Sequence, residues 1–516
     1  MARPTDAVAK ERSEADARKL ADRVLERAII IDTHADTPQM MLDEGYDLAD
    51  RSSPYMVSIP KMRDGHLGAE FFSIWVSVDW PAEDLIHRAL DLIDVVDEQV
   101  ARHSDGLELA LTADDVARIH RQKKIAVLMG VEGGHIIEDD LRALDVFYRL
   151  GVRYMTLTHT KNTQWADSSG DKPQWNGLTD FGRAVVERMN RLGMMVDISH
   201  VSDKTFYDAL AATKAPVIAS HSSCRALCDR PRNMTDDMIR ALAQNGGVMD
   251  INFYSAFVVQ TFADAYKTVS APMDAEVEAE RERLKKEGKH LSYAEETKIR
   301  QKYEANLPTP SFERIADHID HAVKVGGVDH VGLGSDFDGV DSIPRGLEDC
   351  SKIPNLVREL ARRGYSESDL EKILGGNVLR VMRQVEAASR QMQSAESGGD
   401  AGGPVAEKVY SVGRDVAPPQ VTYNPQPTPP EQTNKAKREA TLRVSIVVDS
   451  KGNVRDVHVI KPVGLGLDEK AVDVIHTWKF KPATRNGRPV AARLIVEIKY
   501  RLVDQKKQGD VSSDKH

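Results

Sequence analysis

The sequence predicts an α/β fold, a (β/α)8 TIM-like barrel with a helical insertion, followed by a small C-terminal α+β domain. From Ile29 to about Val385, short apolar runs alternate with amphipathic stretches such as 82–100 and 178–192, an order typical of parallel strands joined by helices. Nearly every apolar run ends on a titratable or metal-binding side chain. Barrel enzymes carry their chemistry at the carboxyl ends of their strands. A doubly wound open sheet is the alternative architecture.

The stretch Met194–His221 shows this pattern most clearly. Two apolar runs, Met194–Ile198 and Pro216–Ala219, are each followed by a serine and then a histidine, His200 and His221. The residues between the runs are enough for a crossover helix, so the two runs fit neighbouring parallel strands. Both histidines are therefore expected in one crevice.

The other runs repeat the arrangement, whereas chance would scatter such residues along the strands. The runs and the residues that follow them are Ile29–Thr33 with His34 and Asp36, Ile125–Met129 with Glu132, Tyr154–Thr158 with His159, Gly247–Ile251 with Asn252, and His330–Leu333 with Asp336.

The remaining segments predict five parts of the chain. Residues 1–28 form an N-terminal helix and residues 29–392 form the barrel. Within the barrel, residues 260–305 are highly charged and helix-prone, which indicates an exposed helical insertion near the site, with its charges in solvent. Residues 393–437 form a Gly- and Pro-rich linker, residues 438–503 the α+β domain, and residues 504–516 a disordered tail.

Composition narrows the class of protein. The 516-residue chain has a formal net charge of -10 at pH 7, which argues against nucleic acid as a partner. Its three cysteines are too few for a disulfide framework, and no apolar run is long enough to span a bilayer. The charged N-terminus lacks a signal-peptide core. A cytoplasmic protein is expected from the sequence as given, and a periplasmic one if the true start lies upstream.

The residue types after the strands indicate a metal site. On an extended backbone, His34 and Asp36 point to the same side and can bind one metal ion. Adding His200, His221 and Glu132 gives two nitrogen-rich half-sites and a spare carboxylate. Zinc takes nitrogen and oxygen ligands, and a pair of zinc ions can activate one water molecule. Glu132 is placed to bridge such a pair.

Long ordered motifs connect residues 29–385 with a known family. The motifs are IDTHAD (31–36), GVEGG (130–134), LTH (157–159), DISH (197–200), SHSSCRALCDRPRN (220–233), GLGSDFDGV (332–340) and the segment 346–381. This set resembles the membrane (renal) dipeptidases, the zinc enzymes of peptidase family M19. The resemblance implies a dinuclear zinc dipeptidase with two zinc ions per chain, acting on dipeptides that include those with a C-terminal D-residue.

The resemblance also implies a role for each site residue. His34 and Asp36 would bind one zinc ion, His200 and His221 would bind the other, and Glu132 would bridge the two ions. His159 would contact the substrate and stabilise the tetrahedral intermediate. Asp336 would transfer the proton, and Arg232 would hold the substrate carboxylate. Two alternatives remain open. One is another metal-dependent amidohydrolase, acting on a lactam, lactone or N-acyl amino acid. The other is a barrel that serves as a binding scaffold.

The C-terminal domain has its own resemblance. LDEKAV, WKFKPA and NGRPV lie between residues 464 and 500, and this segment resembles the C-terminal domain of TonB-type energy transducers. Such a domain implies a protein partner, docked through a small binding module tethered to the enzyme. For the barrel, dipeptides are the expected partners, and a homodimer is a further expectation.

Overall fold

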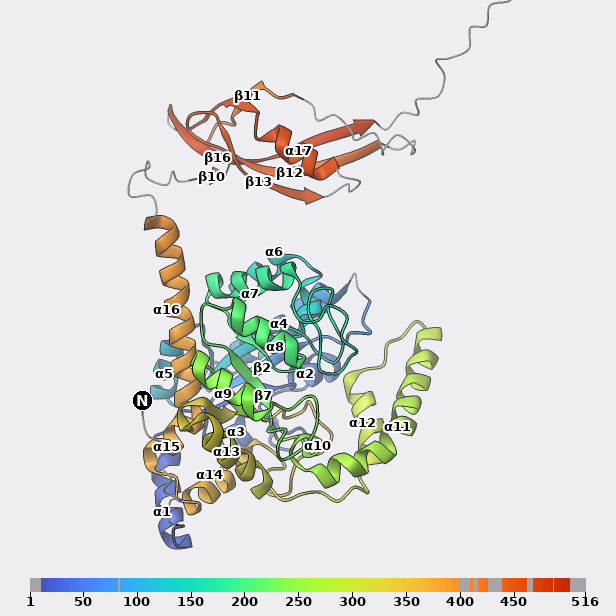
Figure 1. Ribbon diagram of the computed structural model, residues 1–516, viewed down its shortest axis with the longest axis vertical. Coiled ribbons are helices and arrows are strands. Elements are labelled where there is room, and N and C mark those ends of the chain that lie inside the picture. The colour runs from blue at the N-terminus through green and yellow to red at the C-terminus, as the bar shows by residue number, and fades with distance from the viewer. Residues whose placement is uncertain are drawn as a thin grey trace, which may run out of the picture. The chain divides into compact units, whose positions relative to one another are not determined.

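The computed structural model describes residues 11–81, 84–398, 409–411, 416–425, 439–461, 467–485 and 487–501 (Figure 1). The chain divides into two units, Met1–Ser394 and Ala395–His516. The predicted tail at 504–516 and the first ten residues of the predicted N-terminal helix lie outside the described residues. None of the described helices combines the length and apolar character needed to cross a membrane.

The first unit is a closed parallel barrel of eight strands, which confirms the predicted fold and excludes the open sheet. The strands follow the order β2-β1-β9-β8-β7-β6-β5-β4, and β4 pairs in turn with β2. Their bounds are β1 Ile30–Ala35, β2 Leu67–Trp75, β4 Ile125–Glu132, β5 Val152–Thr156, β6 Met195–Asp197, β7 Ile218–Ser222, β8 Val248–Ile251 and β9 Val331–Leu333. A short strand, β3 (Leu107–Leu109), adds to β4 from outside the ring.

Helices surround the barrel (Figure 1). They are α1 Glu14–Leu25, α2 Pro38–Glu44, α3 Ile59–Asp64, α4 Leu85–Arg102, α5 Ala113–Arg121, α6 Leu141–Arg149, α7 Asp180–Leu192, α8 Asp203–Ala212, α9 Asp236–Asn245, α10 Ser255–Val258, α13 Glu313–Gly326, α14 Ile353–Arg362, α15 Glu367–Glu371 and α16 Asn377–Gly398. Local sequence sets their ends. In α7, the Thr179 side chain accepts a hydrogen bond from the Gly182 amide, and Gly193 closes the helix at a φ of 86°.

The barrel core joins residues that are far apart in the sequence. Phe71, Tyr154 and Met195 come from three different strands and belong to one buried cluster, to which α16 adds Val378 and Val381. Burial of such side chains is the main favourable contribution to folding. The last helix of the unit is thereby tied to the barrel strands.

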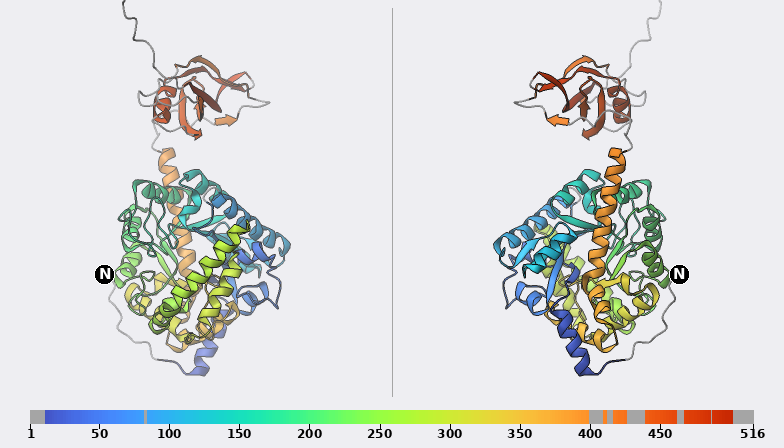
Figure 2. Two further views of the ribbon diagram at one scale, coloured as in Figure 1. Left: turned by 90° about the vertical axis from the view of Figure 1, so that its right-hand side faces the viewer. Right: turned by 90° about the vertical axis from the view of Figure 1, so that its left-hand side faces the viewer.

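The predicted insertion is a pair of helices, α11 (Gln260–Lys286) and α12 (Tyr293–Glu304). Figure 2 shows the two helices, in yellow-green, lying side by side across one face of the barrel unit. Tyr293 donates a hydrogen bond to the Asp338 carbonyl at 2.9 Å, and Tyr254 donates one to Glu304 at 3.0 Å. These two bonds attach α12 to the loops above the barrel.

The second unit is the predicted α+β domain, with more strands than the sequence indicated. The expected elements are β12 Glu439–Val448, β13 Val454–Lys461, α17 Leu467–Ile475 and β16 Arg488–Arg501, and the additional ones are β10 Val409–Ser411, β11 Gln420–Tyr423, β14 Lys479–Lys481 and β15 Ala483–Arg485. Strands β10 and β11 lie within the predicted linker, and α16 extends six residues into its start. An extended segment can pair through its backbone alone, so its Pro-rich composition did not reveal these strands.

Candidate metal centre and substrate cavity

The first half of the site is built around His34 on β1. Its Nε2 lies 3.5 Å from an Asp36 carboxylate oxygen and 3.3 Å from Glu132 Oε2. Its Nδ1 lies 2.8 Å from the Tyr154 hydroxyl, which donates its own proton to the Thr33 carbonyl. The hydroxyl must therefore accept a hydrogen bond from Nδ1, so the lone pair of a neutral His34 is on Nε2. This second-sphere contact orients an imidazole for metal binding.

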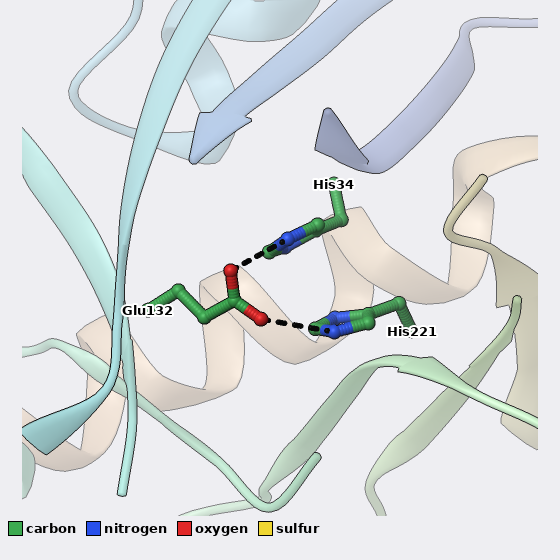
Figure 3. A group of neighbouring side chains, drawn as sticks. All are labelled: His34, Glu132 and His221. Atoms are coloured by element: carbon green, nitrogen blue, oxygen red, sulfur yellow. Dashed lines mark ion pairs between the residues drawn. The ribbon is translucent and has the colours of Figure 1, made fainter. Parts of the chain in front are cut away.

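The second half of the site faces the other oxygen of the same glutamate. Glu132 Oε1 lies 3.0 Å from His200 Nε2 and 3.3 Å from His221 Nε2. The Ser220 hydroxyl donates to Asp197 and contacts His221 Nδ1 at 2.8 Å, so it accepts the Nδ1 proton. The lone pair of His221 is thereby also left on Nε2. Figure 3 shows Glu132 between His34 and His221, with one oxygen directed to each.

Burying these ionisable side chains costs free energy when no cation is bound among them. Burial raises the pKa of Glu132 to about 7, although the adjacent His34 opposes the shift. Burial also lowers the pKa values of His200 and His221 well below the ordinary histidine range. His34 Nε2 is buried and has no hydrogen-bond partner among the described residues. Burial opposes protonation of His34, but Tyr154, Glu132 and Asp36 raise its pKa well above the ordinary range, so this ring holds a proton beside the carboxylates when no cation is bound. Imidazoles that give up such protons beside buried carboxylates form a donor set for a divalent metal ion.

Three overlapping groups have donor atoms close enough to share an ion. They are His34, Glu132 and His221; Glu132, His159 and His200; and His34, Asp36 and Asp336, with all donor atoms in a group within 4.8 Å of one another. The nitrogen and oxygen donors fit zinc. His200 and Asp336 have φ angles of 66° and 67°, a left-handed conformation that is rare outside glycine. Such strained backbone clusters at functional sites.

The predicted substrate-contacting histidine, His159, lies beside this cluster. Its Nε2 is 3.7 Å from Glu132 Oε1, and its Nδ1 accepts a hydrogen bond from Trp75 Nε1 at 3.2 Å. The indole N–H can only donate. Burial lowers the pKa of His159 well below its usual value, so the ring is neutral and its proton is on Nε2. This N–H can donate to an oxygen at the metal centre.

Asp336 and Arg232, the other two predicted residues, also border the cluster. Asp336 accepts a hydrogen bond from Asn252 at 2.7 Å, and burial raises its pKa. Arg232 donates to the His221 carbonyl at 2.6 Å and to the Ser222 hydroxyl at 2.8 Å. A guanidinium has five N–H donors, so three remain for a ligand. Burial lowers the Arg232 pKa to about 10, which leaves the group charged at neutral pH.

A cavity of about 280 Å³ opens onto part of this cluster. Asp36, Glu132, His159, His200 and Asp336 line its metal end. Its other walls include aromatic or charged side chains from α10, from the residue before it and from the insertion: Phe257, Tyr254, Tyr293, Glu296 and Arg300. The expectation that the charges of the insertion are only solvated is therefore wrong for Glu296 and Arg300.

Sequence reasoning gave Tyr154 and Tyr293 no place in the site, and it favoured core packing over a pocket position for Trp75. Trp75 ends β2 in the same way that the metal donors end their strands, so its position was a usable signal. Tyr154 lies within β5 and contacts His34 from there. Tyr293 comes from the insertion, and no pattern in the sequence connects it with the barrel.

The fold and the site together define a metal-dependent hydrolase built on a parallel barrel. Residues 18–396 match the family described as membrane dipeptidase, peptidase family M19, and the chain belongs to this family. It is a metallo-dipeptidase of that family by fold, sequence and donor set.

The matches to relatives span at least 70% of this chain and at least 70% of each relative. Dipeptidase 3 of Homo sapiens is 34% identical over 389 residues, covering 73% of this chain and 70% of that protein. Dipeptidase verJ of Clonostachys rogersoniana is 36% identical over 381 residues, with coverage of 70% and 86%. The crystal structure of the probable dipeptidase PvdM from Pseudomonas aeruginosa matches with a TM-score of 0.64 at 26% identity, covering 72% of this chain and 99% of that one.

The second unit matches a different family. Residues 425–502 correspond to the Gram-negative bacterial TonB protein C-terminal domain. The match begins within the predicted linker, ahead of β12.

Proposed function

We propose that the barrel is a dinuclear zinc dipeptidase that hydrolyses the peptide bond of dipeptides, including those with a C-terminal D-residue. The observation that carries the proposal is the position of Glu132. One of its oxygens faces His34, and the other faces His200 and His221. A carboxylate that divides its oxygens between two donor sets is suited to bridge two ions.

The residues around the cluster account for the remaining steps of hydrolysis. When bound, two zinc ions supply Lewis-acid activation of water and of the scissile carbonyl. His159 donates its Nε2 proton in a hydrogen bond to the carbonyl oxygen as negative charge develops there. Asp336 accepts a proton from the attacking water and passes it to the amine nitrogen as the C–N bond breaks. Arg232 holds the terminal carboxylate with its free N–H groups.

Metal analysis and a matched pair of substrates test this proposal. The purified protein should contain about two zinc ions per chain, and removing them should abolish turnover. Both L-Ala-D-Ala and L-Ala-L-Ala should be hydrolysed, whereas N-acetylalanine should not. Turnover of N-acyl amino acids or lactams without dipeptide hydrolysis would instead favour a different amidohydrolase. Full activity without metal would contradict the mechanism.

We further propose that the C-terminal domain docks a protein partner and takes no part in catalysis. Its match to the TonB C-terminal domain supports this role. All the metal donors lie in the first unit. Removing residues 400–516 should leave kcat and KM for dipeptides unchanged, while a fall in kcat would assign the domain a part in the reaction.

A further inference from the structure

A second, larger cavity lies beside the catalytic one. Its volume is about 540 Å³, and its walls come from the end of β2, the segment that follows it, α2, α4 and the insertion helices. The two cavities share Trp75, Tyr293 and Glu296 in their linings. The rings of Trp75 and Tyr293 pack edge to face, 5.6 Å apart. This aromatic pair therefore borders both the metal centre and the larger cavity, which we call the side chamber.

The side chamber has both apolar and charged side chains in its walls, and the charges of opposite sign nearly cancel. Trp75, Val76, Trp80, Pro81 and Leu291 supply apolar lining. Every described lysine or arginine in the lining has a carboxylate within 4.0 Å. The pairs are Arg88 with Asp43 at 2.7 Å, Arg281 with Asp79 at 3.1 Å, Lys285 with Glu282 at 3.9 Å and Lys289 with Glu287 at 3.2 Å. Since little excess charge is available to hold an ionic group, the lining favours an apolar ligand.

Trp80 offers a preformed aromatic contact in the chamber. Its ring stacks on His290 at 4.9 Å, and the Arg88 guanidinium lies 5.1 Å from the ring centroid. These contacts hold the indole in place before any ligand arrives. A fixed aromatic wall binds another aromatic group with little loss of side-chain entropy.

The topology of the barrel gives the direction in which a substrate extends. Arg232, the proposed carboxylate clamp, hydrogen-bonds to the end of β7. Trp75 ends β2, and four steps around the ring separate β2 from β7 in either direction. The clamp and the side chamber therefore lie on opposite sides of the metal donors. A dipeptide held at Arg232 with its peptide bond at the metal centre directs its N-terminal half toward β2.

The geometry points to the side chamber as the binding site for a bulky aromatic or aliphatic side chain on the N-terminal residue of the substrate. This inference rests on the proposed dipeptidase function and specifies which dipeptides it serves. The side chain passes the edge formed by Trp75 and Tyr293 and packs against Trp80. Small N-terminal residues leave the chamber filled with water and lose this contact.

A kinetic series tests the assignment with the full-length, zinc-loaded protein. The substrates are Ala-Gly, Leu-Gly, Phe-Gly, Trp-Gly, Lys-Gly and Glu-Gly. We expect kcat/KM for Phe-Gly and Trp-Gly to exceed that for Ala-Gly by about ten- to a hundredfold. The Trp80→Ala variant should bring the ratio of Phe-Gly to Ala-Gly close to one. Misfolding would lower both values together and leave the ratio intact.

Trp175→Ala is the matched control. Trp175 is 36% exposed, donates to the Thr163 carbonyl and lines neither cavity, so its loss should leave the ratio unchanged. An equal or higher kcat/KM for Ala-Gly, Lys-Gly or Glu-Gly in the wild type would overturn the inference. The same conclusion follows if Trp80→Ala leaves the aromatic preference intact.

A binding measurement separates this inference from the proposed function. Calorimetry with the zinc-loaded Asp336→Asn variant compares the affinities for Phe-Gly and Ala-Gly when turnover is slow. Tighter binding of Phe-Gly that depends on Trp80 supports the side chamber, even if the wild type proves inactive on every dipeptide. If the two affinities are equal and the wild type hydrolyses dipeptides rapidly, the dipeptidase function stands, but the side chamber does not determine substrate specificity.

Discussion

The hydrogen bond from Trp75 to His159 gives the sharpest test of how the site works. Trp75 Nε1 lies 3.2 Å from His159 Nδ1 and keeps the proton of the neutral ring on Nε2, where it can stabilise a developing oxyanion. Trp75→Phe removes this donor and retains an aromatic ring. A hydrogen bond of this kind contributes about 0.5–1.5 kcal/mol, so kcat for Ala-Gly should fall about two- to tenfold.

The effect should disappear when His159 is absent. His159→Ala removes the oxyanion contact itself and should lower kcat about a hundred- to a thousandfold. If Trp75 acts through His159, adding Trp75→Phe to this variant should cause no further loss. The assay is steady-state hydrolysis of Ala-Gly at saturating substrate, with ¹⁵N chemical shifts of the His159 ring as a second readout of the tautomer. An equal loss from Trp75→Phe with and without His159 would refute the reasoning.

Three other substitutions test separate parts of the site, and a fourth tests the insertion helix α12. Glu132→Gln retains the shape but loses the charge between the two donor sets, so zinc affinity measured by metal titration should fall at least about tenfold; unchanged affinity would exclude the bridge. Asp336→Asn should lower kcat about 10²–10⁴-fold with zinc still bound, and a loss confined to KM would indicate substrate positioning instead. Arg232→Ala should reduce kcat/KM about ten- to a hundredfold for free dipeptides and have no added effect on C-terminally amidated ones, because both changes remove one contact. Burial raises the pKa of Glu304 from 4.5 to about 7, so the folded state holds this proton more tightly and stability should fall as the pH rises from 4.5 to about 7. Glu304→Gln should flatten that decline in thermal unfolding, and an unchanged slope would assign it to another group.

The fold and the grouping of the candidate metal donors were accessible from the sequence because both depend on local patterns. Most barrel strands are short apolar runs, and side chains at their carboxyl ends are placed at the same end of the barrel whatever the details of packing. His34, Glu132, His200 and His221 could therefore be grouped by their positions at or just after the strand ends. The long family motifs added Arg232 and the roles of His159 and Asp336.

Some strands, and the structure within the linker, were harder to predict from the sequence. Strands that pair through their backbones need no particular amino-acid composition. β2 was not anticipated, since buried Glu70 interrupts its apolar pattern. β10 and β11 lie in a stretch whose proline content indicated only an extended chain. Their pairing with β16 and β14 depends on residues about sixty to eighty positions further along, which no local pattern encodes.

Only the tertiary structure decided how the donors are protonated and what surrounds them. The tautomers of His34 and His159 follow from contacts with Tyr154 and Trp75, and each of these pairs spans more than eighty residues of sequence. The side chamber likewise requires β2 and the insertion to meet. The sequence by itself determined which groups could bind metal, because ligand chemistry belongs to residue types. The contacts that orient those groups and shape the cavities join residues that are far apart in the sequence, and only folding brings these residues together.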